Sequence, residues 1–527
     1  MSRRKVAIER TEEFENALAL MEGNDAFLFV TGRAGTGKST LLKLFRENTK
    51  LECAYLAPTG VAALNVNGET IHSFFRFAPG VTVREAAAKG KSADAELYRK
   101  VDVIVIDEIS MVRADLMDCV DAFLKSAMKS TTPFGGKRII AIGDLYQLPP
   151  VVRRDEAEEF ANKYPSPYFF SSEAVDLLRA VGEIRFVELD RIFRQTDKDF
   201  VDVLNGVRNR TATDAHLALL NTRVAKTQPG CFPHKPVVPS QTDDAIYLTS
   251  TNAAADEINA MRMAELGGKT RSYSGNKNGI FAEKDFPVDP ILELKVKARV
   301  MFLNNDSQGR WVNGTLGTIT SGQRDTVNVE IDDGEEVEVD VHTWSSYRSV
   351  YERESGHLNQ EKIGSYTQLP IKLAWATTIH KSQGKTFDKC VIDLGRGAFA
   401  AGQTYVALSR CRTMDGIRLA QPITKRHLLI DWRVSEFLTA LQYGVAESSQ
   451  SKDNRQTMLE DAIMAEAKVR ITYLKSSDAK SVRLISPYAI EEEEYNGQTF
   501  LALRAFCHET KGERVFNLKR VLKVEKD

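Results

Sequence analysis

A glycine-rich segment near the N-terminus, Gly32-Arg-Ala-Gly-Thr-Gly-Lys38-Ser39, has the residue types and spacing of a phosphate-binding loop. It follows the apolar run 27–30 and leads into the helix-like run 40–45, so we expect it between a strand and a helix. The glycines let backbone N–H groups turn toward a phosphate, and a helix N-terminus adds partial positive charge. Lys38 is then placed to reach the β- and γ-phosphates of ATP, and the Ser39 hydroxyl to ligate Mg²⁺. The residues expected to hold the nucleotide here are Gly32, Ala34, Gly35, Thr36, Gly37, Lys38, Ser39 and Thr40.

Two carboxylates supply the second half of such a site. Asp107 and Glu108 directly follow the apolar run 103–106. A carboxylate at the end of a buried strand can hold Mg²⁺, usually through its water shell, which we expect of Asp107. Glu108 can then orient or deprotonate the attacking water. Buried strands also end in solvated acids without any chemistry, but the pairing with the loop predicts ATP hydrolysis.

Three residues far along the chain suit a γ-phosphate. Gln147 lies shortly after the apolar run 138–142, and Arg194 and Arg410 lie hundreds of residues from the loop or from each other. An arginine inserted from a second lobe can add about 10³–10⁵ to the rate of phosphoryl transfer. We therefore predict Gln147, Arg194 and Arg410 as catalytic residues beside Lys38; surface ion pairs are the alternative for both arginines.

The elements that must position these residues follow from apolar periodicity. Residues 26–150 and about 245–419 each alternate short apolar runs with amphipathic segments, which predicts α/β units with parallel sheets. The strands expected in the first stretch are 26–31, 54–57, 101–106 and 138–142. In such sheets ligands collect beyond the carboxyl ends of the strands, where the predicted site residues fall.

Two regions break this pattern. Period-two alternation at 327–331 and 337–341, around an Asp333-Gly334 turn, predicts a β-hairpin within a small β-barrel-like insertion. The serine-rich segment 446–460 is typical of a linker, and short strands are expected again from residue 461 to the C-terminus.

Composition limits the cellular context. The net charge of −1 places any nucleic-acid site in a local basic groove, because the chain has no global positive field. The six cysteines are scattered and lack metal-ligand spacing, which indicates a protein of the reducing environment inside a cell. The start of the chain lacks a signal-peptide core, its basic residues 2–5 suggest a frayed terminus, and no apolar run is long enough for a membrane helix. We expect a cytoplasmic, nucleoid-associated protein without a membrane partner.

Further motifs occur in a fixed order: Ala57-Pro-Thr-Gly-Val-Ala-Ala63, Thr70-Ile-His-Ser-Phe74, Asp107-Glu-Ile-Ser-Met111, Phe134-Gly-Gly136 leading into Gly143-Asp144…Gln147-Leu-Pro-Pro150, Thr378-Ile-His-Lys-Ser-Gln-Gly384 and Tyr405-Val-Ala-Leu-Ser-Arg410. Together with the loop they resemble the Pif family of superfamily 1 DNA helicases over about residues 25–440. The resemblance implies two RecA-like lobes, an insertion in the second lobe, and 5′→3′ translocation on single-stranded DNA by a monomeric motor that unwinds tailed or structured duplexes. It adds Gly384 to the residues expected at the nucleotide.

The expected domains are 1–185 (first lobe), 186–297 and 369–445 (second lobe), 298–368 (insertion), 446–460 (linker) and 461–527 (C-terminal domain). Many relatives of this family read the adenine with a glutamine upstream of the phosphate loop. The comparable stretch here offers Glu15 or Asn16 instead, which leaves the choice of nucleobase open.

The resemblance also implies a DNA groove across both lobes. Single-strand binding needs backbone contacts and flat surfaces on which bases stack. The expected DNA contacts are Pro58, Thr59, His72, Phe74, Thr251, Asn252, His380, Lys381, Ser382 and Gln383. Phe74 could equally be a core residue, and His72 and His380 could be satisfied internally. The turn around Pro79 is expected to split the duplex as a wedge; an ordinary surface loop is the alternative.

The C-terminal segment, 469–523, resembles a WYL domain, although its naming tripeptide is altered to Thr499-Phe-Leu501. Four arginines could form a basic pocket for a nucleotide or single-stranded DNA: Arg483, Arg504, Arg514 and Arg520. They could also be rim charges on a packing module. The partners expected of the domain are single-stranded DNA, a nucleotide or a protein. The acidic run 491–494 is expected to be a solvated turn.

Two other functions stay open. One is a nucleotide-gated clamp that holds DNA without separating strands, and strand displacement on a 5′-tailed duplex discriminates between the clamp and the motor. The other is an RNA helicase, which a comparison of ATPase stimulation by DNA and RNA strands would identify.

Overall fold

The computed structural model describes residues 11–527 except Asp94, Thr196, 225–244, Asp333, 353–356, Arg396, 476–479 and 496–497. The basic start of the chain and Asp333 of the expected hairpin turn therefore lie outside the described residues. The chain divides into two compact units. The larger comprises Met1–Glu183, Val187–Arg208 and Ala212–Leu429, and the smaller comprises Ile184–Phe186, Asn209–Thr211 and Ile430–Asp527. Within the described residues, no helix has both the length and the apolar character needed to cross a membrane.

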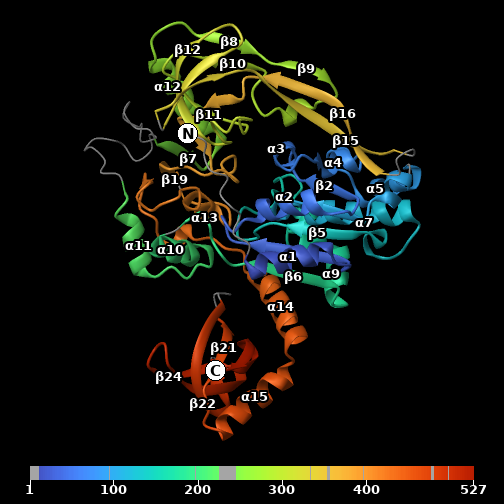
Figure 1. Cartoon of the computed structure of the whole chain (residues 1–527), viewed down its shortest axis with the longest axis vertical. Helices are drawn as coiled ribbons and strands as arrows, with labels where there is room; N and C mark the ends of the chain where they lie inside the picture. The colour runs from blue at the N-terminus through green and yellow to red at the C-terminus, as the bar shows by residue number, and fades with distance from the viewer. Residues whose placement is uncertain are drawn as a thin grey trace. The chain divides into compact units, whose positions relative to one another are not determined.

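The first lobe of the larger unit, where Figure 1 labels β2, β5 and β6, contains a six-stranded sheet with the order β3-β2-β4-β5-β1-β6. Its strands are β1 (Phe27–Gly32), β2 (Cys53–Ala57), β3 (Glu69–Thr70), β4 (Val103–Ile106), β5 (Arg138–Ile142) and β6 (Ile184–Leu189). β1 and β4 each pair in parallel with β5, and β2 pairs in parallel with β3 and β4. Every residue of β1, β4 and β5 is buried, as in parallel sheets that are covered on both faces.

The first lobe also carries nine α-helices in its described residues: α1 (Glu12–Glu22), α2 (Lys38–Asn48), α3 (Gly60–Asn65), α4 (Ile71–Phe74), α5 (Val83–Ser92), α6 (Ala95–Lys100), α7 (Ala114–Met128), α8 (Ala157–Lys163) and α9 (Glu173–Ala180). Threonine side chains cap the N-termini of several of these helices. Thr59 accepts a backbone hydrogen bond at α3, Thr70 at α4, and Thr82 forms a capping box with Glu85 at α5. These caps fix where the chain turns after a strand end, and thus which residues lie at the edge of the sheet.

The second lobe has a parallel sheet with the order β18-β7-β19-β20. Its strands are β7 (Ile246–Thr249), β18 (Ala376–Thr378), β19 (Cys390–Asp393) and β20 (Ile417–Leu419), and its helices are α10 (Lys198–Arg208), α11 (Asp214–Asn221), α12 (Asn252–Glu265) and α13 (Gln403–Leu408). The predicted α/β class is thereby confirmed for both lobes. All residues of α13 are buried, so this short helix lies inside the larger unit rather than on its surface.

The β-rich insertion begins earlier than expected. Its apolar core already includes Tyr273, Phe281 and Leu292, so it starts near β8 rather than at residue 298. Its strands are β8 (Arg271–Ser274), β9 (Asn276–Gly279), β10 (Ile291–Leu294), β11 (Arg299–Phe302), β12 (Leu316–Gly322), β13 (Val327–Ile331), β14 (Glu336–Val339), β15 (His342–Glu352), β16 (His357–Gln368) and β17 (Ile371–Leu373). They form three separate sheets among the described residues, and not one closed barrel. The predicted hairpin of β13 and β14 is confirmed.

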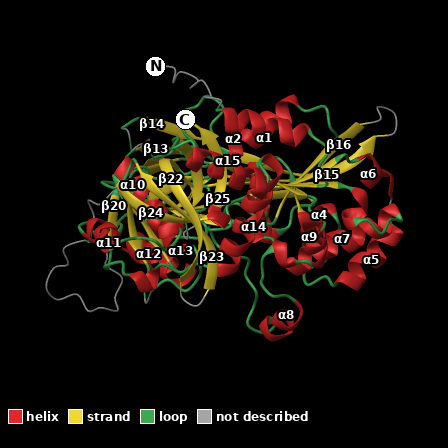
Figure 2. Ribbon diagram, turned by 90° about the horizontal axis from the view of Figure 1, so that it is seen from below, coloured by secondary structure: helices red, strands yellow, loops and turns green. Residues whose placement is uncertain are grey.

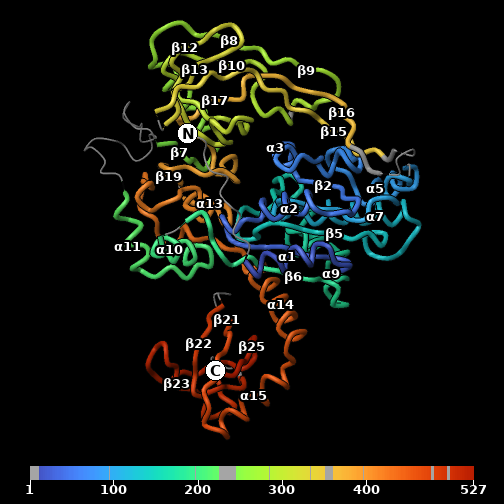
Figure 3. The backbone as a smooth tube through the Cα atoms, in the orientation of Figure 1, coloured from blue at the N-terminus to red at the C-terminus, as the bar shows by residue number. Residues whose placement is uncertain are grey.

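A long hairpin of the insertion, β15–β16, extends to the first lobe (Figure 3). There β15 contacts β3, α4 and α6. The buried Glu69 carboxylate accepts hydrogen bonds from the Ser349 backbone N–H at 2.5 Å and from its hydroxyl at 2.7 Å. Burial nevertheless raises the pKa of Glu69. The insertion is therefore anchored to both lobes of the larger unit.

The smaller unit contains α14 (Trp432–Ser449) and α15 (Lys452–Met464), both labelled in Figure 2. It also contains a five-stranded sheet with the order β24-β23-β22-β21-β25. Its strands are β21 (Val469–Leu474), β22 (Lys480–Tyr495), β23 (Gln498–Cys507), β24 (Gly512–Asn517) and β25 (Val521–Lys526). The segment 446–460, expected as a linker, is helical except at Gln450 and Ser451. Leu459 of α15 lies in the core of the sheet domain, so this domain starts before residue 461. Residues 491–494 lie within β22 and are not a turn.

Candidate nucleotide and nucleic-acid site

The phosphate loop connects β1 to α2, as its sequence predicts. Gly35 (φ +84°) and Gly37 (φ +91°) adopt the left-handed conformation that favours glycine, and Gly37 precedes the first residue of α2. The Lys38 ammonium donates hydrogen bonds to the carbonyls of Gly32 (2.6 Å) and Arg33 (3.0 Å). Burial lowers the pKa of Lys38, although nearby carboxylates oppose this effect. A buried ammonium held only by carbonyl oxygens is electrostatically ready for a phosphate.

The two acidic residues follow β4 at the same edge of the sheet. Burial, and secondly the Asp107 charge, raise the pKa of Glu108 to about 7. Burial likewise raises the pKa of Asp107. A cation at these carboxylates would favour their charged form, so the pair fits a magnesium site. Ser39 is exposed at the start of α2, where its hydroxyl is accessible to such an ion. Among the described residues, no group of three or more His, Cys, Asp or Glu side chains is placed to hold a metal ion.

The second lobe meets this edge through α13. The Ala34 backbone N–H donates to the Tyr405 hydroxyl at 3.0 Å, which joins the phosphate loop to α13. A Cβ atom on Gly402, the residue that caps α13, would lie 2.4 Å from the carbonyl oxygen of Gln147. The side chain of Gln383 donates to that of Gln147 at 3.1 Å. Both lobes therefore contact one another around the phosphate loop and Gln147.

The two predicted arginines converge at Ser409. Arg194 donates to the Ser409 carbonyl at 3.3 Å, and its Cβ lies so close to Gly35 that a side chain there would clash. Arg410, 1% exposed, donates to the Ser409 hydroxyl at 2.9 Å and to three backbone carbonyls, those of Val406, Ser382 and Lys385. Burial, and secondly Arg194, lower the pKa of Arg410 to about 9. Arg410 is thus buried and Arg194 half-buried, whereas the alternative interpretation placed both as surface ion pairs.

A buried ion pair that the sequence did not single out lies beside them. Arg208, in α10, pairs with Asp144 at 3.2 Å, and both side chains are nearly inaccessible. Asp144 also accepts a hydrogen bond from Gln147 at 3.3 Å. Asp144 and Tyr405 could have been found, since both lie in quoted motifs, whereas Arg208 lies in an ordinary amphipathic helix. Only the tertiary structure brings it here.

Charged side chains of both signs gather around the loop. The cations include Lys38, Arg33, Arg194, Arg208 and Arg410, and the carboxylates include Asp107, Glu108, Asp144 and Glu188. Burial lowers the pKa values of Lys38, Arg194 and Arg410, so these groups lack full compensation. A polyphosphate is the anion that would supply it, and the residues present fit ATP.

Phe193 is a further feature that the sequence analysis missed. Phe193 is 42% exposed, its ring lies under the Arg191 guanidinium, and a Cβ atom added to Gly37 would lie 4.0 Å from the Phe193 ring. A pocket of about 300 Å³ next to it is lined by Arg33, Asp190, Ile192, Gln195, Lys198, Val201 and Asp202. An exposed flat ring beside a phosphate loop can stack on a nucleobase.

Among the first-lobe residues predicted to contact DNA, the prediction for Phe74 is wrong. It is 4% exposed and packs edge-on against Phe75 and Tyr98, whose hydroxyl donates to the Phe74 carbonyl. It is therefore a core residue and has no face for a base. Pro58 is half-buried and Thr59 exposed at the end of β2, and His72 is half-buried on α4.

In the second lobe, the predicted contacts separate into two groups. Thr251, Asn252 and Lys381 are exposed, and His380 is half-buried at the edge of the sheet. Ser382 is fully buried and donates to the Ile379 carbonyl, so its hydroxyl does not face a groove. Gln383 contacts Gln147 in the seam instead. Gly384 is exposed with φ +79°, and its position allows approach by a ligand.

Two more lysines lie near Lys381. Lys372 is the cross-strand neighbour of Met301, and the Lys385 ammonium lies 3.8 Å from the Met301 sulfur. Burial, and secondly Lys381, lower the pKa of Lys372 to about 8. Burial also lowers the pKa of Lys385, and Lys372 and Lys381 lower it further. Like charges held this close favour an anion such as a DNA phosphate.

Comparisons with known proteins agree with this geometry. The PIF1-like helicase family profile matches residues 6–216. The ATP-dependent DNA helicase Pif1 of Bdellovibrio bacteriovorus is 34% identical over 439 residues, which cover 82% of this chain and 92% of that protein. The chain belongs to the PIF1-like helicase family. This confirms the predicted family, and a WYL domain profile that matches residues 456–526 confirms the C-terminal resemblance.

Solved structures of this family resemble the chain closely. Bacteroides sp Pif1 in complex with ADP-AlF4 has a TM-score of 0.73 and 36% identity, over 82% of this chain and 97% of that one. Bacteroides Pif1 bound to single-stranded DNA has a TM-score of 0.57 at the same identity and coverage. The fold of most of this PIF1-like chain is thus similar to that of solved Pif1 helicases.

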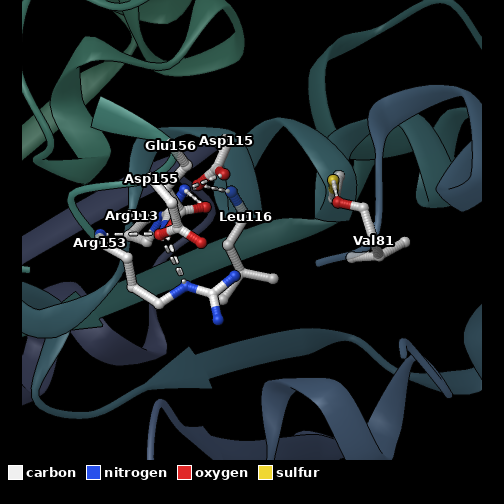
Figure 4. Close-up of polar contacts among 8 residues, drawn as sticks. Val81, Arg113, Asp115, Leu116, Arg153, Asp155 and Glu156 are labelled. Atoms are coloured by element: carbon white, nitrogen blue, oxygen red, sulfur yellow. Dashed lines mark hydrogen bonds and ion pairs between the residues drawn. The ribbon is translucent and has the colours of Figure 1, made fainter. Parts of the chain in front are cut away.

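The turn expected as a wedge in this PIF1-like chain lies between α4 and α5. Pro79 and Gly80 are exposed, and Gly80 has φ +74° with open space around it. Behind the turn, the Cys119 thiol of α7 donates to the Val81 carbonyl at 3.5 Å (Figure 4).

The same helix, α7, is tied to the segment that follows Gln147. Figure 4 shows Arg113, just before α7, paired with Asp115 and Glu156, each at 2.7 Å. Arg153 also reaches Glu156, at 3.5 Å. One helix therefore contacts both the wedge turn and the segment after Gln147.

The four arginines of the WYL domain do not form one pocket. Arg504 is opposite Val515 across β23 and β24, whereas Arg514 is opposite Ala505, so the two arginines are on opposite faces of the sheet. Arg504 is ion-paired with Glu491 and Glu493. Arg483 contacts the Cys507 sulfur, and Arg520 donates to the Leu474 carbonyl. A single site made of all four arginines is therefore ruled out.

Proposed function

We propose that this chain is an ATP-dependent DNA helicase that moves 5′→3′ on single-stranded DNA and separates tailed or structured duplexes. One observation carries the proposal: Arg194 and Arg410 meet at Ser409 beside the phosphate loop, where Tyr405 of the second lobe binds Ala34 of the first. A nucleotide at this place would contact both lobes, so its binding and hydrolysis change their separation.

The hydrolytic roles follow from the chemistry of each group. Lys38 binds the β- and γ-phosphates, and Asp107 with Ser39 would hold Mg²⁺, which neutralises phosphate charge when bound. Glu108, with its raised pKa, accepts the proton of the attacking water. Gln147 orients that water, and Arg194 and Arg410 stabilise the charge that develops on the γ-phosphate. Phe193 stacks on the base, without the hydrogen bonds that would select adenine.

The DNA track runs along the strand ends of both lobes. Thr59 and His72 on the first lobe, and Thr251, Asn252 and His380 on the second, contact the strand. Lys372, Lys381 and Lys385 bind backbone phosphates, the dominant source of affinity in nucleic-acid binding. Bacteroides Pif1 bound to single-stranded DNA is a relative of the same architecture, which supports this partner. Pro79 would divide the two strands of a duplex ahead of the moving lobes.

Unwinding of duplexes with a 5′ or a 3′ single-stranded tail tests the proposal. Purified full-length chain with Mg·ATP should displace the strand only from the 5′-tailed duplex, and single-stranded DNA should stimulate its ATPase. Stimulated hydrolysis without displacement would instead identify a nucleotide-gated clamp. Stimulation by RNA that equals stimulation by DNA of the same sequence would identify an RNA motor.

The WYL domain is proposed to bind single-stranded DNA or a protein partner and so regulate the motor. Arg483 and Arg514 lie on the face opposite Arg504 and have no carboxylate ion pair among the described residues. Binding of a labelled oligonucleotide to the full-length chain and to Arg514→Ala tests the first alternative. Equal affinity of the two proteins would favour the protein partner.

A further inference from the structure

An arginine that lies in none of the ordered motifs, Arg208, is placed beside the nucleotide site. It is the last residue of α10 in the second lobe, whereas Asp144 follows β5 in the first lobe. The Arg208 guanidinium donates to Asp144 Oδ1 at 3.2 Å and lies over the Tyr146 ring, 4.2 Å from its centroid. The Arg208 side chain is 4% exposed and that of Asp144 is fully buried. The guanidinium is therefore held from two sides.

The Asp144 carboxylate connects Arg208 to Gln147. Its Oδ1 atom accepts hydrogen bonds from the Arg208 guanidinium and from the Tyr146 backbone N–H, each at 3.2 Å. Its Oδ2 atom accepts a hydrogen bond from the side-chain amide of Gln147 at 3.3 Å. Because a carboxylate is planar and its two oxygens move together, a donor that fixes Oδ1 also fixes where Oδ2 lies. Arg208 thus determines, through Asp144, where the amide of Gln147 is held.

The amide of Gln147 is fixed at both of its ends. Its nitrogen donates to Asp144, and its oxygen accepts from the Gln383 side chain at 3.1 Å. An amide has two N–H donors and an oxygen with two lone pairs, and these contacts among the described residues use one of each. The second donor can bind a γ-phosphate oxygen while the second lone pair accepts from a water. A rigid amide with this arrangement can align the water with the phosphorus atom.

Stability alone is a weak reason for a buried ion pair at this place. Apolar residues of similar volume often stabilise a protein interior as well as such a pair does, because two charges lose their hydration. Although burial opposes the charge, Asp144 raises the pKa of Arg208, so the guanidinium stays charged. A charged pair with directed hydrogen bonds fixes orientation, which apolar contacts cannot do. The orientation of Gln147 is the feature that this pair controls.

We propose that Arg208 is a positioning residue for ATP hydrolysis, which acts through Asp144 to hold Gln147 in the orientation that aligns the attacking water. Arg208 does not touch the nucleotide. The aligned water forms a bond to the γ-phosphorus, the bond from that phosphorus to the bridging oxygen of ADP breaks, and Glu108 takes the proton of the water. This role rests on the proposed function, in which Gln147 orients the water.

The test measures the ATPase of the full-length chain with saturating single-stranded DNA. Arg208→Met should lower kcat by about 10- to 100-fold, because small misplacements of a reacting group are costly, and should change the KM for ATP by less than about threefold. In a chain that already carries Gln147→Ala, the same substitution should lower kcat no further. Arg208→Lys keeps a positive charge beside Asp144 but lacks the planar fork, so it should melt like the wild type and lower kcat by about 3- to 10-fold.

A matched control is Arg210→Met, at an exposed arginine two residues after Arg208, which should keep kcat within about twofold. Equal fold losses of kcat from Arg208→Met with and without Gln147→Ala would mean that Arg208 only supports the fold, and would overturn its positioning role. Wild-type kcat in either Arg208 variant, or in Gln147→Ala, would do the same. A wild-type ATPase that ignores single-stranded DNA would overturn the helicase proposal alone, because the same comparisons can be made on the basal ATPase.

Discussion

The seam between the two lobes and the sheet of the WYL domain both contain arginines that the sequence assigns to an anion, but their surroundings differ. Arg410 is 1% exposed and donates only to carbonyl and hydroxyl oxygens. Arg504 is partly exposed and is ion-paired with Glu491 and Glu493. An arginine that lacks a carboxylate partner in a buried place keeps its charge available for a ligand, whereas Arg504 in β23 is already neutralised by two carboxylates of the neighbouring strand β22.

The seam and the WYL sheet also differ in how closely other elements pack against them. At the seam, a side chain on Gly402 would meet the backbone carbonyls of Tyr146 and Gln147, and one on Gly35 would meet the Cβ of Arg194, so the two lobes pack closely there. The outer face of the WYL sheet instead exposes Phe506 and Val515. Close contact around a ligand site favours motion that depends on the ligand, and an open face favours docking of a partner.

The largest effect is expected on the rate of ATP hydrolysis when Arg410 is replaced. Arg410→Ala should lower kcat for ATP hydrolysis by about 10³–10⁵ while nucleotide binding persists, because the arginine acts mainly on the transition state. Arg504→Ala should leave kcat within about twofold. Single-turnover hydrolysis and binding of a fluorescent nucleotide measure the two properties. Equal losses of binding and turnover in Arg410→Ala would mean that the arginine is structural, and a thermal melt of each variant controls for folding.

The second largest effect concerns stability. Asp144→Asn removes the partner of the buried Arg208 and should lower the free energy of unfolding by about 3–5 kcal/mol, because an uncompensated charge stays inside. Glu491→Gln, at the exposed ion pair of the WYL domain, should leave the unfolding curve unchanged. Urea denaturation compares the two variants, and a wild-type midpoint for Asp144→Asn would contradict the assignment of this pair.

A smaller effect, on the affinity for DNA, is expected from the lysines near Lys381. The pKa of Lys372 is lowered to about 8, so Lys372 is charged at pH 7 and mostly neutral at pH 9. A DNA phosphate raises that pKa again, and binding should therefore take up a proton near pH 8 and tighten as the pH falls. In Lys372→Ala, the slope of log affinity against log salt should be shallower by about 0.7 at pH 7. Wild-type slopes that are equal at pH 7 and 9 would exclude Lys372 from the phosphate track.

The smallest effect should follow removal of the WYL domain. A chain that ends at Gln450 keeps α14 and both lobes and should retain basal ATPase within about twofold, because no predicted catalytic residue lies beyond Arg410. Truncation at residue 460 would leave most of α15 without the sheet on which Leu459 packs and is the poorer design. Measuring unwinding by the shorter chain then separates the motor from its regulation. Loss of basal ATPase would show that the domain supports the seam.

Local patterns predicted much of the nucleotide site. The glycine spacing of the loop, the carboxylates after an apolar run, and the order of the motifs each depend on neighbours in sequence. The α/β class and the β13–β14 hairpin followed from periodicity in the same way. The domain boundaries were predicted less well, because the insertion starts near β8 and the expected linker is helical.

Other features depended on which side of an element faces which neighbour. Phe74 belongs to an aromatic core whose other members lie up to about fifty residues away, and the sequence cannot show that they meet. The four WYL arginines look equivalent in sequence, but strand register places Arg504 and Arg514 on opposite faces. The Arg208–Asp144 pair also joins separate elements.

The sequence by itself determined that this chain binds a nucleoside triphosphate and belongs with the Pif helicases, because those properties depend on short segments whose residues act together. Only the tertiary structure decided which polar groups lack a partner, which aromatic rings are exposed, and which residues of the second lobe reach the phosphate loop. The physical reason is that burial and pairing depend on distances between elements far apart along the chain, which local composition does not specify.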